Sequence, residues 1–163
     1  MSEPWLSGAH LEVNALLRPI LFSLEQSQDD LRTWTEGISD EAMWSKPHGL
    51  APLGFQLRHI AGSVDRLFTY AQDATLSDAQ MLFLKAEMQP GASREQLLAD
   101  IDATFSRIKQ VIETIDPATL GNQRGVGRKK LPTTVIGLLI HLAEHTQRHV
   151  GEAIITAKLL KQS

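Results

Sequence analysis

Three histidines recur at intervals of four residues near the C-terminal end of the chain, at positions 141, 145 and 149. In an α-helix, residues four apart lie one turn along the axis and about 40° around it, so neighbours in such a series point into the same space. With Leu138 as the reference on a helical wheel, His145 and His149 fall about 20° to either side of it. Solvation alone explains poorly why two imidazoles would be centred on an apolar face. The spacing indicates either a metal site, since imidazoles at i and i+4 are a common ligand pair, or a set of hydrogen-bonded core histidines.

The composition excludes several classes of site and partner. The chain has no cysteine, which removes disulfides, thiolate nucleophiles and cysteine-based zinc sites and leaves histidine, carboxylate and water as ligands. Its 163 residues, 42% hydrophobic and 21% charged with a net charge of −3, are typical of one globular domain over residues 1–163. That balance favours neither a nucleic acid nor a membrane surface as a partner. No apolar stretch approaches ~18 residues and the N-terminus lacks a signal-peptide pattern, so we expect a cytoplasmic protein.

Helical periodicity covers most of the chain. Apolar residues recur at threes and fours in four long segments, over residues 8–37, 53–72, 93–115 and 132–161. Pro19 lies inside the first segment and is expected to kink or break it, because proline removes a backbone donor. The capping-box pattern that begins at Ser77 opens a shorter helix between the second and third segments. No strand pattern is recognised. The sequence therefore predicts an all-α four-helix bundle with one short crossover helix.

Other histidines and a basic loop carry weaker signals. His10, near the start of the first segment, is predicted to be a surface or cap residue. His48 lies in a loop rich in proline and glycine and is predicted to be solvated. A glycine-rich loop over residues 120–131 carries four cations: Arg124, Arg128, Lys129 and Lys130. This loop fits a solvated surface, and the alternative is a lid that contacts an acidic substrate; it lacks the strand and the Gly-Lys-Ser/Thr ending of a phosphate loop.

A further histidine can complete the C-terminal pair. His59, in the second long segment, falls where it can face the interior of a bundle, and bundles build metal sites from residues on facing helices. If the second and fourth helices are neighbours, His59 joins His145 and His149 in a set of three. Three neutral nitrogens leave at least one coordination position for water or substrate. An ion held in this way could acidify a bound water or activate an incoming thiol.

With these residues in place, the chain resembles the DinB/YfiT-like family of metal-dependent enzymes, which are four-helix bundles with one histidine on the second helix and an H-x-x-x-H pair on the fourth. The resemblance covers nearly the whole chain and is carried by Trp5, the turn at Trp44, and residues 56–62, 76–78 and 145–152. It implies that His59, His145 and His149 bind a divalent cation, usually zinc or nickel, with water completing the shell. It also implies a small-molecule substrate, in some members with a low-molecular-weight thiol, and a homodimer.

Two features depart from the family pattern or extend it. Many members follow the last ligand histidine with Arg-Gly-Gln, whereas this chain has Val-Gly-Glu at residues 150–152 and an arginine, Arg148, before the histidine. The departure affects the specific substrate chemistry and leaves the three histidines intact. Glu152 shares the face of His149, where it could accept a hydrogen bond from a ligand, serve as a fourth ligand, or be a polar rim residue. His141 is predicted to support the site rather than to bind the ion.

Three functions are consistent with these residues. The first is a divalent-metal-dependent transferase or hydrolase that acts on a small molecule. The second is a module that binds a metal without turnover. The third is a dimerising helical protein whose histidines are packed, hydrogen-bonded groups.

Overall fold

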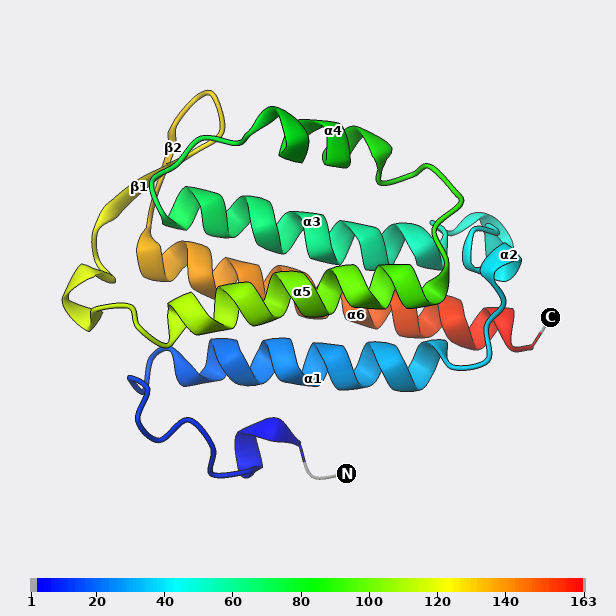
Figure 1. Cartoon of the computed structure of the whole chain (residues 1–163), viewed down its shortest axis with the longest axis horizontal. Helices are drawn as coiled ribbons and strands as arrows, with labels where there is room; N and C mark the ends of the chain where they lie inside the picture. The colour runs from blue at the N-terminus through cyan, green and yellow to red at the C-terminus, as the bar shows by residue number, and fades with distance from the viewer. Residues whose placement is uncertain (1–2, 163) are drawn as a thin grey trace.

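Four long helices run side by side in the computed structural model, which describes residues 3–162 (Figure 1). They are α1 (Arg18–Thr35), α3 (Leu53–Ala71), α5 (Arg94–Ile112) and α6 (Val135–Leu160). Both α1 and α3 pack against α5 and against α6, which closes a ring around one apolar core. Phe68 and Phe105 are the largest fully buried side chains in that core. The predicted all-α four-helix bundle is confirmed. Within residues 3–162, no helix combines the length and the apolar character needed to cross a membrane.

The first helix begins later than its sequence pattern predicted. A 3-10 turn, η1 (Pro4–Leu6), and irregular turns occupy the chain before Arg18. Gly8 and His10 both have positive φ angles, which a right-handed helix does not accommodate. Pro19 lies in the first turn of α1, where a missing backbone donor leaves no hydrogen bond unmade, so the proline starts the helix and does not kink it. The predicted helical start at residue 8 was therefore wrong.

Short elements connect the long helices. The helix α2 (Asp40–Met43) and the 3-10 turn η2 (Pro47–Gly49) join α1 to α3. The crossover helix α4 (Asp78–Ala86) begins at the predicted capping box and lies over α3, outside the ring of four (Figure 1). A second capping box, at Ser93, opens α5. The predicted crossover helix is thus confirmed.

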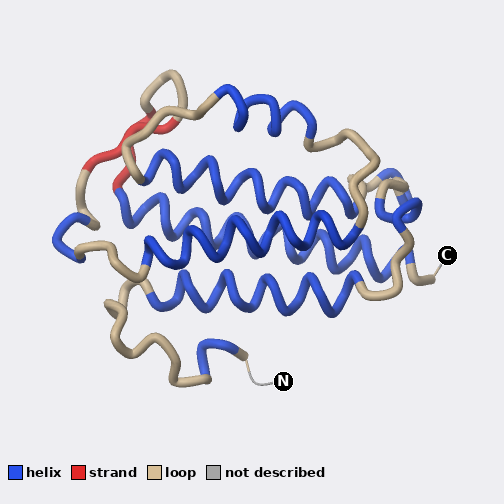
Figure 2. The backbone as a smooth tube through the Cα atoms, in the orientation of Figure 1, coloured by secondary structure: helices blue, strands red, loops and turns tan. Residues whose placement is uncertain are grey.

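A small hairpin replaces the predicted loop before the last helix. After the 3-10 turn η3 (Pro117–Thr119), β1 (Gln123–Val126) pairs antiparallel with β2 (Leu131–Thr134), shown in red in Figure 2. The expectation of no strand was wrong because four-residue strands with a glycine and a proline show no alternating pattern. The helix α6 accordingly starts at Val135 and not at residue 132. Of the four cations, Arg124 donates to the carbonyl of Ala71 at 2.7 Å, and the other three are exposed.

Candidate metal centre

The rotation of α6 about its own axis directs His145 and His149 towards α3. The amide of Gln147, between them in sequence, donates to α1: to the carbonyl oxygen of Ser23 at 2.9 Å and to the hydroxyl of Ser27 at 3.0 Å. These bonds fix the α1-facing side of the helix. The two histidines are therefore available to the neighbouring helix on the other side.

The two imidazoles lie at the edge of the buried face of α6 and not at its centre. Leu142, Thr146 and Val150 are almost fully buried, while both histidines are half-buried. On the helical wheel the buried residues of α6 centre about 70° from Leu138, whereas the sequence pattern predicted Leu138 at the centre of the apolar face. The histidines are consequently only partly buried where α6 packs against α3, and such access is what a reactive site, unlike a packed core, requires.

His59 from α3 meets the pair where the two helices pack together. The Nε2 atoms of His59 and His145 lie 3.0 Å apart, and the ring centroid of His149 lies 4.3 Å from that of His59 and 4.5 Å from that of His145. Each of the three residues offers a nitrogen atom within 4.8 Å of the others. Phe55 stacks on His59 with the ring centroids 5.4 Å apart. The three residues singled out in the sequence therefore come together with the spacing that a single ion needs.

A buried carboxylate sets the tautomer of His59. Oε2 of Glu87 lies 2.8 Å from Nδ1 of His59, and the Glu87 side chain is only 4% exposed. Because an ionised carboxylate can only accept, Nδ1 carries the proton and donates it to this bond. The lone pair of Nε2 is then directed at the other two histidines, as metal ligation requires.

His149 is oriented by a different arrangement. Its Nδ1 lies 2.8 Å from Oε1 of Gln56, and Nε2 of Gln56 in turn donates to Glu152 at 2.8 Å. The carboxylate of Glu152 fixes which end of the amide faces the ring, since only the NH₂ group can donate to it. Nδ1 of His149 therefore donates to Gln56, and its Nε2 is unprotonated and free to bind an ion.

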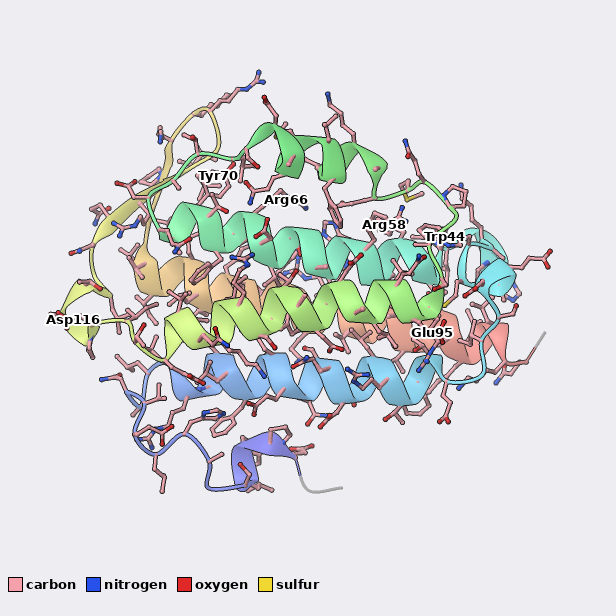
Figure 3. The ribbon with its side chains drawn as sticks, viewed as in Figure 1. Trp44, Arg58, Arg66, Tyr70, Glu95 and Asp116 are labelled. Carbon is pink, nitrogen blue, oxygen red and sulfur yellow. The ribbon has the colours of Figure 1, made fainter. Side chains whose placement is uncertain are left out.

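The segment after α4 is held in place so that Glu87 reaches His59. Arg58, the residue before His59, donates to the backbone carbonyls of Ala86, at 2.8 Å, and of Gln89. The guanidinium of Arg58 lies 4.7 Å from the ring centre of Trp44, whose indole donates to a carbonyl further along the same segment. Figure 3 shows Arg58 and Trp44 together at this end of the bundle. Cation–π and hydrogen-bond contacts thus position the carboxylate.

The surroundings of the cluster favour neutral imidazoles. Burial, together with the charges that His149 and His59 would carry, lowers the pKa of His145 to about 4. Burial also lowers the pKa of His149, again with a contribution from His59. A metal ligand must be deprotonated, so these lowered pKa values leave both side chains ready to bind an ion near neutral pH.

The remaining histidines and Glu152 lie outside the cluster. His141 is exposed and lies 3.0 Å from Glu144, and its ring centroid lies 5.5 Å from that of His145, so it borders the cluster. Glu152 is half-exposed; it accepts from Gln56, and its Oε2 also lies 3.6 Å from Nδ1 of His149. His48 is exposed, as predicted. His10 is not a surface or cap residue: it is half-buried and its Nε2 lies 2.9 Å from Glu25 on α1.

Two functional residues escaped the sequence analysis. Gln56 lies one turn before His59, within a segment already noted for its family resemblance, so its helical spacing could have indicated it. Glu87 lies 28 residues after His59 in a connecting segment, and no local pattern points to it. Only the path of the chain after α4 brings that carboxylate to the site.

Comparison with known proteins relates this fold and site to a family. A conserved protein from Enterococcus faecalis has a similar structure, with a TM-score of 0.74 and 14% identity over 90% of this chain and 97% of that one. YfiT from Bacillus subtilis, described as a probable metal-dependent hydrolase with an unusual four-helix bundle topology, is similar at a TM-score of 0.68 and 15% identity over 87% and 86%. At such identities the likeness shows the fold alone. No curated protein sequence matches. The sequence profile of the DinB superfamily matches residues 23–153, which include all three clustered histidines, and the chain belongs to that superfamily.

Proposed function

We propose that this protein is a metal-dependent enzyme in which His59, His145 and His149 hold one divalent cation. The observation that carries the proposal is the convergence of three imidazoles from two helices, with Nδ1 of His59 and of His149 each committed to an acceptor. Neutral imidazole nitrogens suit zinc, nickel, cobalt or iron, so the donor set fits such an ion. Of these, zinc and nickel are the ions we propose, on the basis of the family resemblance.

Three protein ligands would leave at least one coordination position for water or substrate. When bound there, a divalent cation supplies Lewis acidity, which polarises a substrate oxygen and makes a coordinated water or thiol a better nucleophile. The protein contributes orientation: Glu87 and Gln56 hold the imidazoles of His59 and His149 in the ligating tautomer. Phe55 covers one face of His59 and limits the access of water to it. The partly buried cluster would thereby present an activated position to a small molecule.

Hydrolysis is the reaction we favour, and YfiT's description as a probable metal-dependent hydrolase supports it. Transfer to a low-molecular-weight thiol is the second candidate, because the same Lewis acidity would activate a thiol and no cysteine in the chain could replace it. The resemblance also supports a homodimer. A thermal-shift screen of the metal-loaded protein against esters, amides, thiols and electrophiles would separate these reactions, since a ligand of the native state raises its melting temperature.

Metal content tests the proposal directly. The full chain is purified without a histidine tag, loaded with zinc or nickel, and measured by inductively coupled plasma mass spectrometry. We expect one ion per chain in the natural protein and less than about a tenth of that in His59→Ala and in the double variant His145→Ala/His149→Ala, because loss of a ligand removes most of the affinity.

Two histidines outside the cluster provide matched controls. His48→Ala and His141→Ala each remove an exposed imidazole that is not one of the three proposed ligands, and we expect both to keep full metal content. Full metal content in His59→Ala and in the double variant alike would refute the three-histidine centre. Loss of metal in His141→Ala would instead enlarge the ligand set.

A further inference from the structure

A cleft lies between the crossover helix and the bundle, on the part of α3 adjoining the metal centre. Its volume is about 350 Å³, and it is bounded by α3, α4 and α5. Apolar side chains form much of its wall: Ala61, Ala79, Phe83 and Ala103. A space of this size and lining suits a small molecule with an apolar body.

Arg66 supplies the cleft with a buried, incompletely paired charge. The residue is 8% exposed, and Figure 3 shows it on the side of α3 that faces α4. A guanidinium has five N–H donors, yet the only acceptor of Arg66 within residues 3–162 is Glu87, 2.7 Å from Nη1 and not aligned as a hydrogen bond. Nη1 is the only Arg66 nitrogen that is both fully buried and without a hydrogen-bond partner, so the other donors of Arg66 are accessible and lack a protein acceptor among the described residues. A planar oxyanion in the cleft would satisfy them in the bidentate geometry that arginine favours.

The other charged groups in the wall are already committed or exposed. Asp65 is paired with Arg107 and accepts from the amide of Gln80 at 2.6 Å. Asp100 is exposed on α5, where water screens it. With Glu87, three acids lie near two arginines, so the cleft has no excess positive charge and suits a single carboxylate held locally at Arg66 better than a multiply charged group such as a phosphate.

One carboxylate connects this cleft with the metal centre. Glu87 contacts Arg66 through Oε1, at 2.7 Å, and His59 through Oε2, at 2.8 Å. A Cβ atom on Gly62 would lie 2.7 Å from both Nη1 of Arg66 and Oε1 of Glu87, so the absence of a side chain there makes the contact possible. Any change in the contact between Arg66 and Glu87 therefore alters the hydrogen bond between Glu87 and His59.

We propose that the cleft binds the carboxylate of a small, apolar molecule at Arg66, and that its occupancy is transmitted to the metal centre through Glu87 and His59. A bound carboxylate competes with Glu87 for Arg66 and adds negative charge. Glu87 then accepts more strongly from Nδ1 of His59, which makes the imidazole a better ligand. The binding site itself stands without a metal, whereas the transmission rests on the proposed function.

Benzoate tests the binding site in metal-free protein, where it cannot ligate an ion. Isothermal titration of the natural chain should give a dissociation constant on the order of 1 mM, as expected for a ligand of this size. Ala103→Trp fills the cleft from α5 and leaves Arg66 in place, and Arg66→Gln removes the charge. We expect both variants to weaken benzoate binding at least about tenfold. Ala103→Trp excludes the ligand sterically, and Arg66→Gln loses a charge-assisted bidentate contact.

Two matched controls test whether binding depends on the charge of the ligand and on the position of the arginine. Benzamide has the shape of benzoate without its charge and should bind at least about tenfold more weakly. Arg32→Gln removes an arginine that pairs with Asp102 on the outside of the bundle, and should bind benzoate normally. The site is refuted if benzoate does not saturate the protein by about 20 mM, well above the expected dissociation constant. It is equally refuted if Ala103→Trp binds benzoate normally or benzamide binds as well as benzoate.

Zinc affinity tests the transmission. With a competing chelator, zinc should bind about 3–10-fold more tightly in benzoate than in benzamide, a coupling at the modest end of those seen between linked sites. The difference should vanish in Ala103→Trp, which distinguishes the cleft from direct binding of benzoate to the ion. An unchanged affinity in the natural chain refutes the transmission. Failure to bind zinc at all would refute the proposed function, while the titration of metal-free protein would still decide the cleft.

Discussion

Two residues outside the histidine cluster, Glu87 and Gln56, orient its imidazoles through hydrogen bonds of the same length in different surroundings. We call them the two supports of the cluster. Nδ1 of His59 and Nδ1 of His149 each lie 2.8 Å from an acceptor oxygen. For His59 the acceptor is the carboxylate of Glu87, whose side chain is 4% exposed. For His149 it is the neutral amide of Gln56, whose carboxylate partner, Glu152, is 51% exposed.

This difference shows that distance alone does not rank the two supports. A buried carboxylate keeps its charge only while it is paired, so removing it or its partner leaves an uncompensated charge inside the protein. An exposed carboxylate is solvated and screened, and its removal changes little. We therefore expect metal affinity and stability to depend strongly on Glu87, which supports His59, and weakly on Glu152, which supports His149 through Gln56.

The largest expected effect comes from Glu87→Ala. The substitution strands Arg66 in a buried position and frees the tautomer of His59, so we expect a loss of about 3 kcal/mol in the free energy of unfolding. Metal affinity should fall about 10–100-fold, as for other residues that orient a metal-binding histidine. Urea unfolding of the metal-free protein and chelator competition with zinc measure the two quantities separately.

Glu144→Ala is the matched control for Glu87→Ala. Glu144 also lies beside a histidine, His141, but both are exposed and outside the cluster. Its removal should change neither the metal affinity nor the unfolding midpoint measurably. Equal effects of the two substitutions would show that burial does not distinguish the supports.

Most of the fold could be predicted from the sequence, because long amphipathic helices repeat one signal many times. Two capping boxes also marked where α4 and α5 begin. The first helix was misplaced because Leu11 and Leu16 follow helical spacing although both are more than half exposed. The hairpin was missed because β1 and β2 are each too short for a pattern to emerge.

The site was predictable in its histidines and not in their partners. The i, i+4 spacing and the helical faces of α3 and α6 brought out His59, His145 and His149. Glu87 follows a crossover helix, and its approach to His59 depends on Arg58 and Trp44 fixing the path of the chain. Contacts made by connecting segments are set by tertiary packing, which local periodicity does not encode.

Gly62→Ala probes the His59 side without removing any polar group. The added methyl would lie within 2.8 Å of Arg66, Glu87 and Phe83, so one of them must move. We expect destabilisation of about 1–3 kcal/mol, typical of an overpacked site, together with weaker zinc binding. Gly151→Ala on α6 is the control, because nothing lies within 4 Å of its Cβ position. A stabilised Gly62→Ala protein would show that the Arg66–Glu87 contact tolerates displacement.

The pH dependence of stability tests the surroundings of His145 and His149, the two cluster histidines on α6. The pKa of His145 is lowered to about 4 and that of His149 is lowered as well, so the unfolded chain binds more protons than the native one below the ordinary histidine pKa of about 6.5. This contribution to stability is complete above about pH 6.5 and is lost as the pH falls towards 4. For two half-buried groups we expect it to amount to about 1–2 kcal/mol after solvent screening.

Urea unfolding of metal-free protein at several pH values between 4.5 and 7.5 measures this loss, on the scale set by the histidine pKa values. His145→Gln should show a shallower pH dependence than the natural chain, because one titrating group has been removed. His48→Gln, in the exposed η2 turn, serves as the control and should retain the full dependence. An identical slope for His145→Gln and the natural chain would contradict the low pKa.

The smallest effect should come from Glu152→Ala. Gln56 loses the acceptor that fixes its amide, but Nδ1 of His149 still donates to Oε1 of Gln56 whenever the amide keeps its orientation. We expect at most about a threefold loss in zinc affinity and less than about 0.5 kcal/mol in stability, because the carboxylate is half-exposed. Gln56→Leu removes the acceptor itself and should weaken zinc binding about tenfold. If Glu152→Ala weakened binding as much as Glu87→Ala, Glu152 would have to act on the ion or on His149, 3.6 Å away, as strongly as the buried carboxylate acts on His59, and the asymmetry between the two supports would be wrong.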